Sequence, residues 1–416
     1  MKRDASLWVR NGRLEDRVVD MELRNGFITQ IVDAGASPVR AKGLDAQGGL
    51  LSPPYADPHI HLDAALLGAD YPNQSGTLWE GIANWAKAKT KLTRADTLRR
   101  ATQVLRWCVA HGTTSVRSHA DTGCTIGVDA LLSLRQEVAD WCTLEVVAFP
   151  QDGIYTGSGR EKALRRAVEA GCDAVGAIPH YERTTAEGTT SLRHIFELAA
   201  EFGCKVDVHC DETDDPGSRH LETLCALTID HKLQGRVVAG HCTAMHSYPT
   251  AYADKVIGWV VEAQVQVVAN PLDNIVLQGR FDDYPKRRGI TRIPELLAAD
   301  AHVGIGHDSV MDPWYPLGTG NLLDAASMLI HVCQMTSVAE IDRVFRIVTE
   351  DNHRPFGRSP RLVVGEPADL LVHTSDSPIE VLRTRKPPRW VLRGGDIVAE
   401  TTAGESRVCG RLVRWS

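Results

Sequence analysis

The sequence has no C-x-x-C pair, although ten of its 416 residues are cysteine. The cysteines are scattered and several lie in apolar runs, so we expect reduced and mostly buried thiols. No run of about 18 apolar residues is present, and we therefore expect no transmembrane helix. The charged start, Met1–Asp4, is not followed by an apolar segment, so we expect no signal peptide. Together these absences predict a cytoplasmic protein.

Basic residues are also fewer than acidic residues. The chain has 46 Lys and Arg against 53 Asp and Glu, which gives a formal net charge of -7. No basic field is available to attract a phosphate backbone, so we expect no nucleic-acid partner. The hydrophobic fraction of 43% and the charged fraction of 24% are those of an ordinary globular protein. A chain of this length predicts one large domain with a smaller one.

No internal repeat or low-complexity segment is visible, but both ends of the chain are rich in short β-type runs. Near the start, these runs are separated by Asn11-Gly12 and by Asn25-Gly26, and Asn-Gly between such runs is a strong hairpin signal. Near the end, similar runs cover residues 369–372 and 390–398. We predict that the two ends form one small discontinuous β-sandwich domain, made of residues 1–52 and 363–416.

The middle of the chain, residues 53–362, alternates apolar β-type runs with longer helical patterns, which is typical of repeated βα units. Eight such runs predict an α/β fold, a TIM-like (β/α)8 barrel, in which functional residues gather at the C-terminal ends of the strands. The first connection, residues 64–112, is long and contains helical patterns near Trp85 and over 98–109. We expect it to form a wall or lid of a pocket. The predicted strands end near His61, His119, Pro150, Pro179, His209, His241, Asn270 and His307.

Residues that commonly bind metals stand at several of these strand ends. His59 and His61 are two apart, so in a strand their side chains face the same side. In a chain with 16 histidines the pair is a weak signal, and each histidine alone is as well explained as a core residue. Together with His209 and Asp308, the pair offers three imidazoles and one carboxylate, which suit one zinc or iron(II) ion. His241, at another strand end, is either a fifth ligand or an acid/base group.

Three further features of the strand-end loops bear on the chemistry. Glu212 follows His209 by three residues and can carry protons, although a surface glutamate in an acidic loop is the alternative. Gln151 has an amide that suits the edge of a heterocycle bearing a carbonyl, although it equally fits a turn. Residues 176–180 lack the lysine that typically bridges the ions of a two-metal barrel, so we infer a single metal ion.

These residues together resemble the amidohydrolase superfamily, and within it the bacterial cytosine deaminases. The likeness covers nearly the whole chain and is carried by runs far more specific than a His-x-His pair. The matching stretches are Pro58–Asp63, Asn73–Leu78, Ala148–Gln151, Val208–Glu212, Thr243–Tyr248, Gln278–Asp282, Tyr284–Gly289 and Asp312–Gly318.

The resemblance implies hydrolytic deamination of a free pyrimidine base. The four expected ligands would bind one iron(II) or zinc ion, whose bound hydroxide attacks the amino-bearing carbon so that ammonia leaves. His241 and Asp308 would help to deprotonate the water, and Glu212 would protonate the ring nitrogen beside the attacked carbon. The residues implied to contact the base are Gln151, which holds its carbonyl and N–H edge, and Leu78 and Trp314, which line the pocket.

At one position the sequence departs from the resembled enzymes, which usually carry a second Asp directly after the metal Asp. Here Asp308 is followed by Ser309, which is smaller and neutral and should open space beside C5 of the pyrimidine. We therefore predict that 5-methylcytosine is accepted at least as well as cytosine.

One alternative is an aminohydrolase for isoguanine, creatinine-like or s-triazine rings. The other is a non-catalytic barrel scaffold, which the complete set of metal ligands disfavours. We further expect that the protein forms a homo-oligomer, binds a small-molecule nucleobase as its substrate, and does not associate with a membrane.

Overall fold

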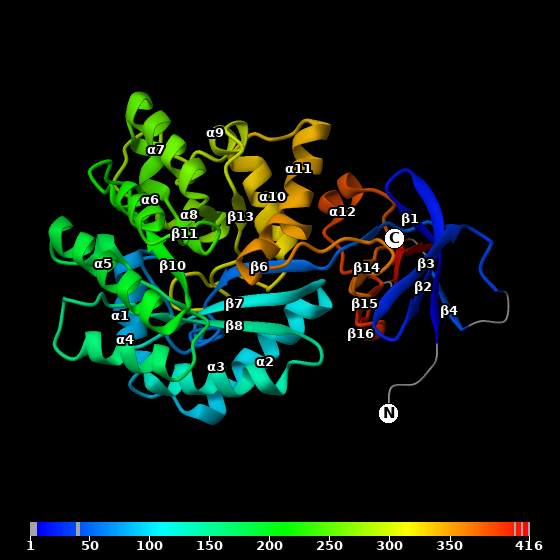
Figure 1. Ribbon diagram of the computed structural model, residues 1–416, viewed down its shortest axis with the longest axis horizontal. Coiled ribbons are helices and arrows are strands. Elements are labelled where there is room, and N and C mark those ends of the chain that lie inside the picture. The colour runs from blue at the N-terminus through cyan, green and yellow to red at the C-terminus, as the bar shows by residue number, and fades with distance from the viewer. Residues whose placement is uncertain (1–5, 39–41, 403–404, 409–410, 415–416) are drawn as a thin grey trace.

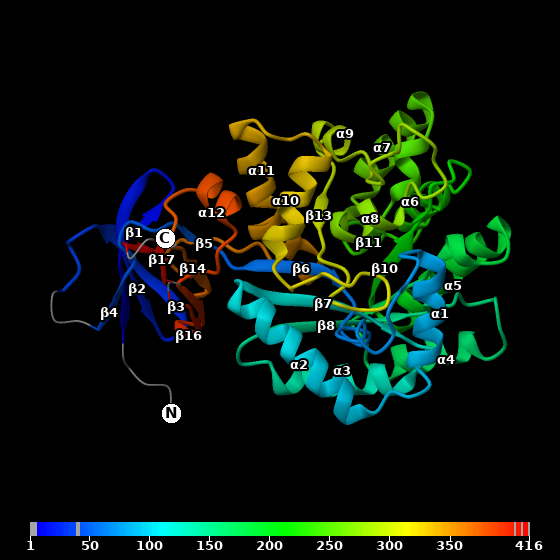
Figure 2. The same cartoon turned by 180° about the vertical axis from the view of Figure 1, so that it is seen from behind.

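The computed structural model describes residues 6–38, 42–402, 405–408 and 411–414. It consists of a helix-covered barrel and a smaller domain of β-sheets, and both ends of the described chain contribute to the smaller domain (Figures 1 and 2). In the part of the chain that is described, no helix has the length and apolar character needed to cross a membrane.

The barrel is built on one eight-stranded sheet in which each strand runs parallel to its neighbours and follows them in chain order. A bridge between Ile60 and Asp308 joins its first and last strands. There the N–H of Asp308 donates to the carbonyl of His59 at 2.8 Å, and the N–H of His61 donates to the carbonyl of Asp308 at 3.1 Å. The predicted TIM-like barrel is therefore confirmed. The strands are β6 (Tyr55–Ile60), β7 (Thr113–Asp121), β8 (Thr143–Phe149), β9 (Ala174–Val175), β10 (Lys205–Cys210), β11 (Val237–His241), β12 (Gln266–Ala269) and β13 (Val303–Ile305).

Helices surround the barrel, as both ribbon views show (Figures 1 and 2). Their ends follow local sequence signals, as where Ser337 and Glu340 form a capping box at the start of one helix. The long connection over residues 64–112 contains two helices, one of which includes Trp85, as predicted. The helices are α1 (Leu78–Ala88), α2 (Arg94–Ala110), α3 (Thr125–Glu137), α4 (Arg160–Glu169), α5 (Thr185–Phe202), α6 (His220–Asp230), α7 (Thr250–Ala263), α8 (Pro271–Leu277), α9 (Ile293–Ala298), α10 (Leu322–Val332), α11 (Val338–Thr349) and α12 (Pro378–Thr384), with 3-10 turns η1 (Pro179–Tyr181), η2 (Thr243–Ser247) and η3 (Asp351–Phe356).

Alternation along the strands separates an apolar outer layer from a polar barrel interior. Val116 on β7 and Val206 on β10 are fully buried in the apolar core shared with the helices. Their neighbours Arg117 and Asp207 instead meet each other, with Arg117 Nη1 2.8 Å from Asp207 Oδ2. Because side chains two apart share a face, His119 and His209 also point into the interior, and this places them at the C-terminal end of the barrel.

The smaller domain has two four-stranded sheets, in the orders β3-β2-β1-β4 and β16-β15-β14-β5, whose facing side chains form one apolar core. The predicted sandwich from both chain ends is confirmed, and we keep its boundaries at residues 52 and 363 as a proposal. The strands are β1 (Leu7–Leu14), β2 (Arg17–Arg24), β3 (Phe27–Asp33), β4 (Gly43–Asp45), β5 (Leu51–Ser52), β14 (Leu370–Val372), β15 (Trp390–Arg393) and β16 (Asp396–Glu400), with a separate pair β17 (Glu405–Val408) and β18 (Arg411–Arg414).

One of the two predicted Asn-Gly turns is wrong. Asn11-Gly12 lies within β1, where the pairing register with β2 shifts, and the chain reverses at Glu15-Asp16. Asn11 has a φ of 54°, and its N–H and side-chain amide donate to Asp20 and Asp45, both at 2.9 Å. These contacts favour a bulge over a turn. The turn at Asn25-Gly26 is confirmed.

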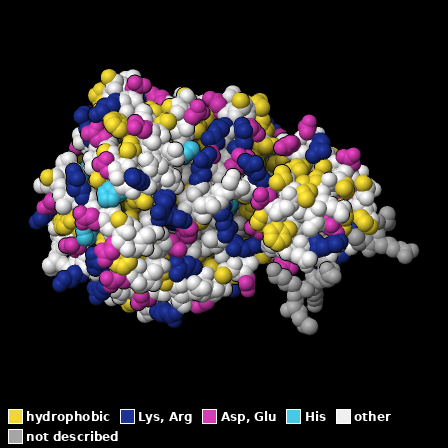
Figure 3. All heavy atoms as spheres, viewed as in Figure 1, with side chains coloured by type: hydrophobic (Ala, Val, Ile, Leu, Met, Phe, Trp, Pro, Cys, Tyr) yellow, Lys and Arg dark blue, Asp and Glu magenta, His cyan; other side chains and the backbone are white. Residues whose placement is uncertain are grey.

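Charges of both signs are interspersed on the face of the molecule shown in Figure 3, without one large basic patch on that face. Among the described residues, nine cysteines are free thiols, and seven of these are buried. The tenth, Cys409, and the charged start Met1–Asp4 lie outside the described residues.

Candidate metal centre and active site

Three histidines and one aspartate meet at the C-terminal end of the barrel. His59 lies on β6 and His61 just after it, His209 lies on β10, and Asp308 follows β13. The Nε2 atoms of His61 and His209 are 3.1 Å apart. Asp308 Oδ1 lies 3.6 Å from His59 Nε2 and 3.4 Å from His61 Nε2, and all four side chains are buried. The structure thus brings together the four residues that the sequence predicted as metal ligands.

The chemistry of this cluster fits a divalent metal ion. Neither ring nitrogen of His59 has a hydrogen-bond partner among the described residues, and the same holds for Nδ1 of His209. Buried polar atoms normally have a partner, so a ring nitrogen of His59 is available to a bound ion. Burial holds the pKa of His59, His61 and His209 well below the ordinary value, which keeps each imidazole neutral with a free lone pair. Three neutral imidazoles and a carboxylate suit zinc or iron(II).

His119 is a member of the cluster that the sequence argument did not select. It stands at the end of β7, and its nearest ring nitrogen lies within 4.8 Å of those of His59 and His209. Its Nε2 is 3.1 Å from Asp207 Oδ1, whereas its Nδ1 has no partner among the described residues. Its position at the end of a predicted strand is the sequence signal that could have indicated it.

His241 and Glu212 lie beside the cluster rather than within it. His241 Nδ1 is 3.5 Å from Glu212 Oε1 and 3.9 Å from Asp308 Oδ2. The side-chain amides of Asn270 and Asn274 contact the His241 ring at 3.2 and 3.0 Å and fix its orientation. This arrangement favours the acid/base role for His241 over a fifth place around the ion. Burial raises the pKa of Glu212 to about 8, so that near neutral pH this carboxyl can both hold and release a proton.

The backbone is strained at two of these positions. Asp308 and His241 both have a φ of 67°, in the left-handed region that non-glycine residues rarely adopt. Such strain persists only where surrounding contacts hold it, and it concentrates at functional sites. For Asp308 those contacts are the backbone hydrogen bonds that close the barrel.

A cavity of about 690 Å³ opens onto the cluster. The four residues predicted to contact a substrate all line it, and Leu78 belongs to the long connection that was expected to form a pocket wall. Asp273, in the first turn of α8, also lines the cavity, and no signal in the sequence had indicated it. The predicted residues in the lining are Leu78, Gln151, Ser309 and Trp314, together with Glu212, His241 and Asp308.

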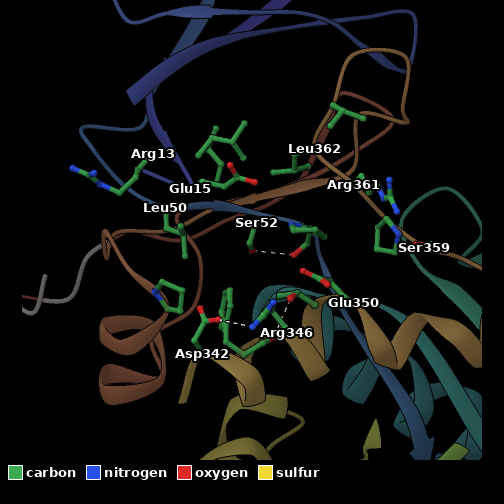
Figure 4. A pocket seen from close by; sticks show the side chains of 18 of the residues that line it. Arg13, Glu15, Leu50, Ser52, Asp342, Arg346, Glu350, Ser359, Arg361 and Leu362 are labelled. Atoms are coloured by element: carbon green, nitrogen blue, oxygen red, sulfur yellow. Dashed lines mark hydrogen bonds and ion pairs between the residues drawn. The ribbon is translucent and has the colours of Figure 1, made fainter. Parts of the chain in front are cut away.

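A second cavity, of about 1590 Å³, separates the smaller domain from α11 and was not predicted (Figure 4). Its wall includes charges of both signs, such as Arg13, Glu15, Glu350 and Arg361. Figure 4 shows Arg13 and Arg361 on opposite sides of the cavity, so these side chains do not converge on one point. The cavity has none of the metal-centre residues in its lining.

Comparison with known proteins identifies the family. Residues 86–399 match the model of the amidohydrolase family, which is more than half of the chain. The chain belongs to the amidohydrolase family. A 5-methylcytosine deaminase from Klebsiella pneumoniae, solved with 5-fluorocytosine, is 36% identical to this amidohydrolase and superposes on it with a TM-score of 0.92. That match covers 98% of this chain and 100% of the other.

Two further relatives are less similar in sequence, and their matches also cover most of both chains. A pterin deaminase from Rhizobium rhizogenes is 27% identical over 91% of this amidohydrolase and 87% of its own length. An N-isopropylammelide isopropyl amidohydrolase from Pseudomonas sp. is 25% identical over 96% of this chain and 98% of its own. The predicted membership of the amidohydrolase superfamily is confirmed. The similarity of this chain to deaminases extends over the residues of the metal cluster and the cavity.

Proposed function

We propose that the protein is a metal-dependent aminohydrolase that converts a free cytosine-type base into the corresponding carbonyl compound and ammonia. The observation that carries this proposal is the lining of a single cavity. An acid/base pair, Glu212 and His241, and an amide, Gln151, surround a space that ends at the histidine cluster. The similarity to a 5-methylcytosine deaminase supports the same class of substrate.

A metal ion in the cluster would supply one part of the chemistry, and the surrounding residues would supply the proton transfers. A divalent ion held by His59, His61, His209 and Asp308 would act as a Lewis acid and lower the pKa of a bound water. Asp308 and His241, whose Oδ2 and Nδ1 atoms are 3.9 Å apart, would accept the proton of the attacking water. Glu212 would donate a proton to the ring nitrogen beside the attacked carbon. The new C–O bond would then replace the C–N bond, the proton of the added hydroxyl would pass to the departing amino group to give ammonia, and the proton accepted by Asp308 and His241 would restore the acid form of Glu212.

Gln151 would hold the base in register for this reaction. Its amide offers both a donor and an acceptor, which complements the adjacent N–H and carbonyl of a pyrimidine. It is 9% exposed, at the cavity wall, so its hydrogen bonds to a base would form out of bulk water.

The proposal that 5-methylcytosine is accepted at least as well as cytosine rests on Ser309. It directly follows Asp308, is 2% exposed, and lines the cavity. A serine leaves room where an aspartate would add bulk and charge. A methyl group buried in that space would favour the methylated base by about 1 kcal/mol, or roughly fivefold.

A second candidate is an aminohydrolase for a pterin or an s-triazine ring. It is favoured by the characterised relatives, which match this chain almost end to end. It is also compatible with the volume of the cavity, which is within the range of pockets for larger ligands. A non-catalytic scaffold is disfavoured because the ligands and the acid/base residues are assembled together.

A substrate panel tests these proposals. Purified protein, loaded with zinc or with iron(II), is assayed for ammonia release from cytosine, 5-methylcytosine, isoguanine, creatinine, a pterin and an amino-s-triazine. We expect turnover of the two cytosines, with 5-methylcytosine at least equal. Exclusive turnover of the pterin or the triazine would establish the second candidate instead. A protein that cannot be loaded with metal and releases no ammonia would be the scaffold.

A further inference from the structure

One buried carboxyl group in the cavity is not used by the mechanism above. Asp273 lines the cavity from the first turn of α8 and is only 2% exposed. Its Oδ1 atom is buried and has no hydrogen-bond partner among the described residues. Leaving a buried carboxylate oxygen without a donor is unfavourable, so a donor is expected from whatever occupies the cavity.

The neighbours of Asp273 are mostly acidic. Burial and the charges of Asp312 and Glu212 raise its pKa, and a divalent ion held by the adjacent cluster would oppose that rise and favour the charged carboxylate. Asp308 is close as well, because after burial the charge of Asp273 is the largest cause of the raised pKa of Asp308. Such a concentration of buried carboxyls favours a ligand that brings N–H groups and disfavours one that brings further negative charge.

The other three carboxyl groups near Asp273 already have contacts or roles. Asp312 Oδ1 accepts hydrogen bonds from the N–H groups of Trp314 and Tyr315 at 2.9 and 3.0 Å, and so holds the loop after Ser309. Asp308 belongs to the metal cluster, and Glu212 contacts His241. Asp312 Oδ2 also lacks a partner among the described residues, but Asp312 does not line the cavity, so Asp273 is the cavity-lining carboxyl that remains available to a substrate.

The position of Asp273 indicates which part of a base it meets. Hydrogen bonding by Ser309, through its hydroxyl and its N–H, partly offsets the rise in the pKa of Asp273, so the two residues are adjacent. Asp273 thus stands beside Ser309, which faces C5 in the proposed pose, and beside Asp308, which faces the reacting carbon. The donor nearest to both on a cytosine is the exocyclic amino group.

We propose that Asp273 is a substrate-binding residue whose carboxylate accepts a hydrogen bond from the amino group that leaves. The inference rests on the proposed function and deepens it, because it assigns the residue that distinguishes substrate from product. The substrate presents an N–H donor to this carboxylate, whereas the product presents a carbonyl oxygen, which the carboxylate repels. Asp273 would therefore favour entry of the aminated base and departure of the product.

The test is the Asp273→Asn variant, studied as the metal-loaded enzyme. Loss of the charged acceptor should raise KM for 5-methylcytosine about tenfold or more, in line with hydrogen bonds to charged groups. The new amide N–H should bind the product carbonyl, so Ki for thymine as a competitive inhibitor should fall. A residue that only supports the structure would not move the two constants in opposite directions.

Asp312→Asn is the matched control, because it removes a buried carboxyl from the same group but at a position outside the cavity lining. It should lower stability and leave the ratio of Ki for thymine to KM unchanged. If Asp273→Asn does not fold, Asp273→Ala is used, for which KM should rise without any rise in Ki.

Three outcomes overturn the inference. Unchanged constants, or constants that move together, would show that Asp273 does not contact the amino group. Loss of bound metal from Asp273→Asn would show that the residue supports the metal centre instead. A wild-type protein that releases ammonia from neither cytosine would refute the proposed function together with this inference, whereas the first two outcomes leave that function intact.

Discussion

The N–H of Asp308 donates to the carbonyl of His59 at 2.8 Å, and the carboxylate of the same Asp308 lies 3.6 Å from the ring of the same His59. One pair of residues therefore closes the barrel with its backbone and builds the metal cluster with its side chains. Asp308 makes both contacts with a φ of 67°, in the strained left-handed region. Because an ion bound there would hold both strands, metal binding should also stabilise the closed barrel.

Metal content is the first expectation. The protein should bind about one iron or zinc ion per chain, since the candidate ligand groups found among the described residues share His59 and form one cluster. Asp308→Asn keeps the backbone bridge, so it should retain the fold by circular dichroism while losing most of the metal in elemental analysis. Asp312→Asn serves as the control that keeps its metal. A stable content near two ions in the wild type would contradict the single-ion site.

Glu212→Gln should keep both the metal and the fold but lose most of its turnover. An amide cannot pass a proton, and general acid/base groups typically contribute about 10²–10⁴-fold to the rate. The control is Glu182→Gln, another buried glutamate, whose oxygens accept from the N–H groups of Ile154 and Tyr155. That variant should lose stability and keep a near-normal kcat per folded, metal-loaded chain. A near-normal kcat in Glu212→Gln would remove Glu212 from the mechanism.

Ser309→Asp should shift the preference toward cytosine. The wild type is expected to show a kcat/KM for 5-methylcytosine at least equal to that for cytosine, and the added carboxyl would fill the space beside C5. Ser309→Asn, of similar size but neutral, separates the effect of bulk from that of charge. The measurement is kcat/KM for both bases in all three proteins. A strong preference of the wild type for cytosine, or a ratio that Ser309→Asp leaves unmoved, would show that this position does not select the methyl group.

The parts of the fold that were predictable are those with a local signal. Each barrel strand lies in an apolar run, and the runs that end near His61, His209 and His307 lead into the predicted ligands. The strand count and the cluster of His59, His61, His209 and Asp308 therefore followed from spacing and the barrel rule. The prediction at Asn11-Gly12 was wrong because the conformation there depends on Asp20 and Asp45, which lie on two other strands, β2 and β4.

Two members of the site had no decisive local signal. The availability of His119 Nδ1 depends on Asp207, 88 residues away in the chain, which takes the other ring nitrogen. Asp273 lies in a short helix whose sequence, Pro-Leu-Asp-Asn, resembles an ordinary helix start. Only the packing of that helix against the loop of Ser309 makes Asp273 part of the cavity.

The last expectation concerns stability at acidic pH and depends on His373, where the smaller domain meets the barrel. Its Nε2 lies 2.9 Å from Ser52 Oγ, and burial lowers its pKa from 6.5 to about 3. Below pH 6.5, His373 therefore binds a proton in the unfolded chain but not in the folded chain, so the free energy of unfolding falls as the pH falls. By linkage, this one histidine should account for about 2 kcal/mol of the loss between pH 7 and pH 5.

His373→Gln should remove that contribution. Urea unfolding at pH 7 and pH 5 should show a loss of stability on acidification that is smaller by about 2 kcal/mol in the variant than in the wild type. Every other group is common to both proteins, so the difference isolates His373. The exposed His331, replaced by Gln, is the matched control for a histidine-to-glutamine change. An identical pH dependence in His373→Gln and the wild type would mean that His373 accepts a proton in the folded protein as readily as in the unfolded chain.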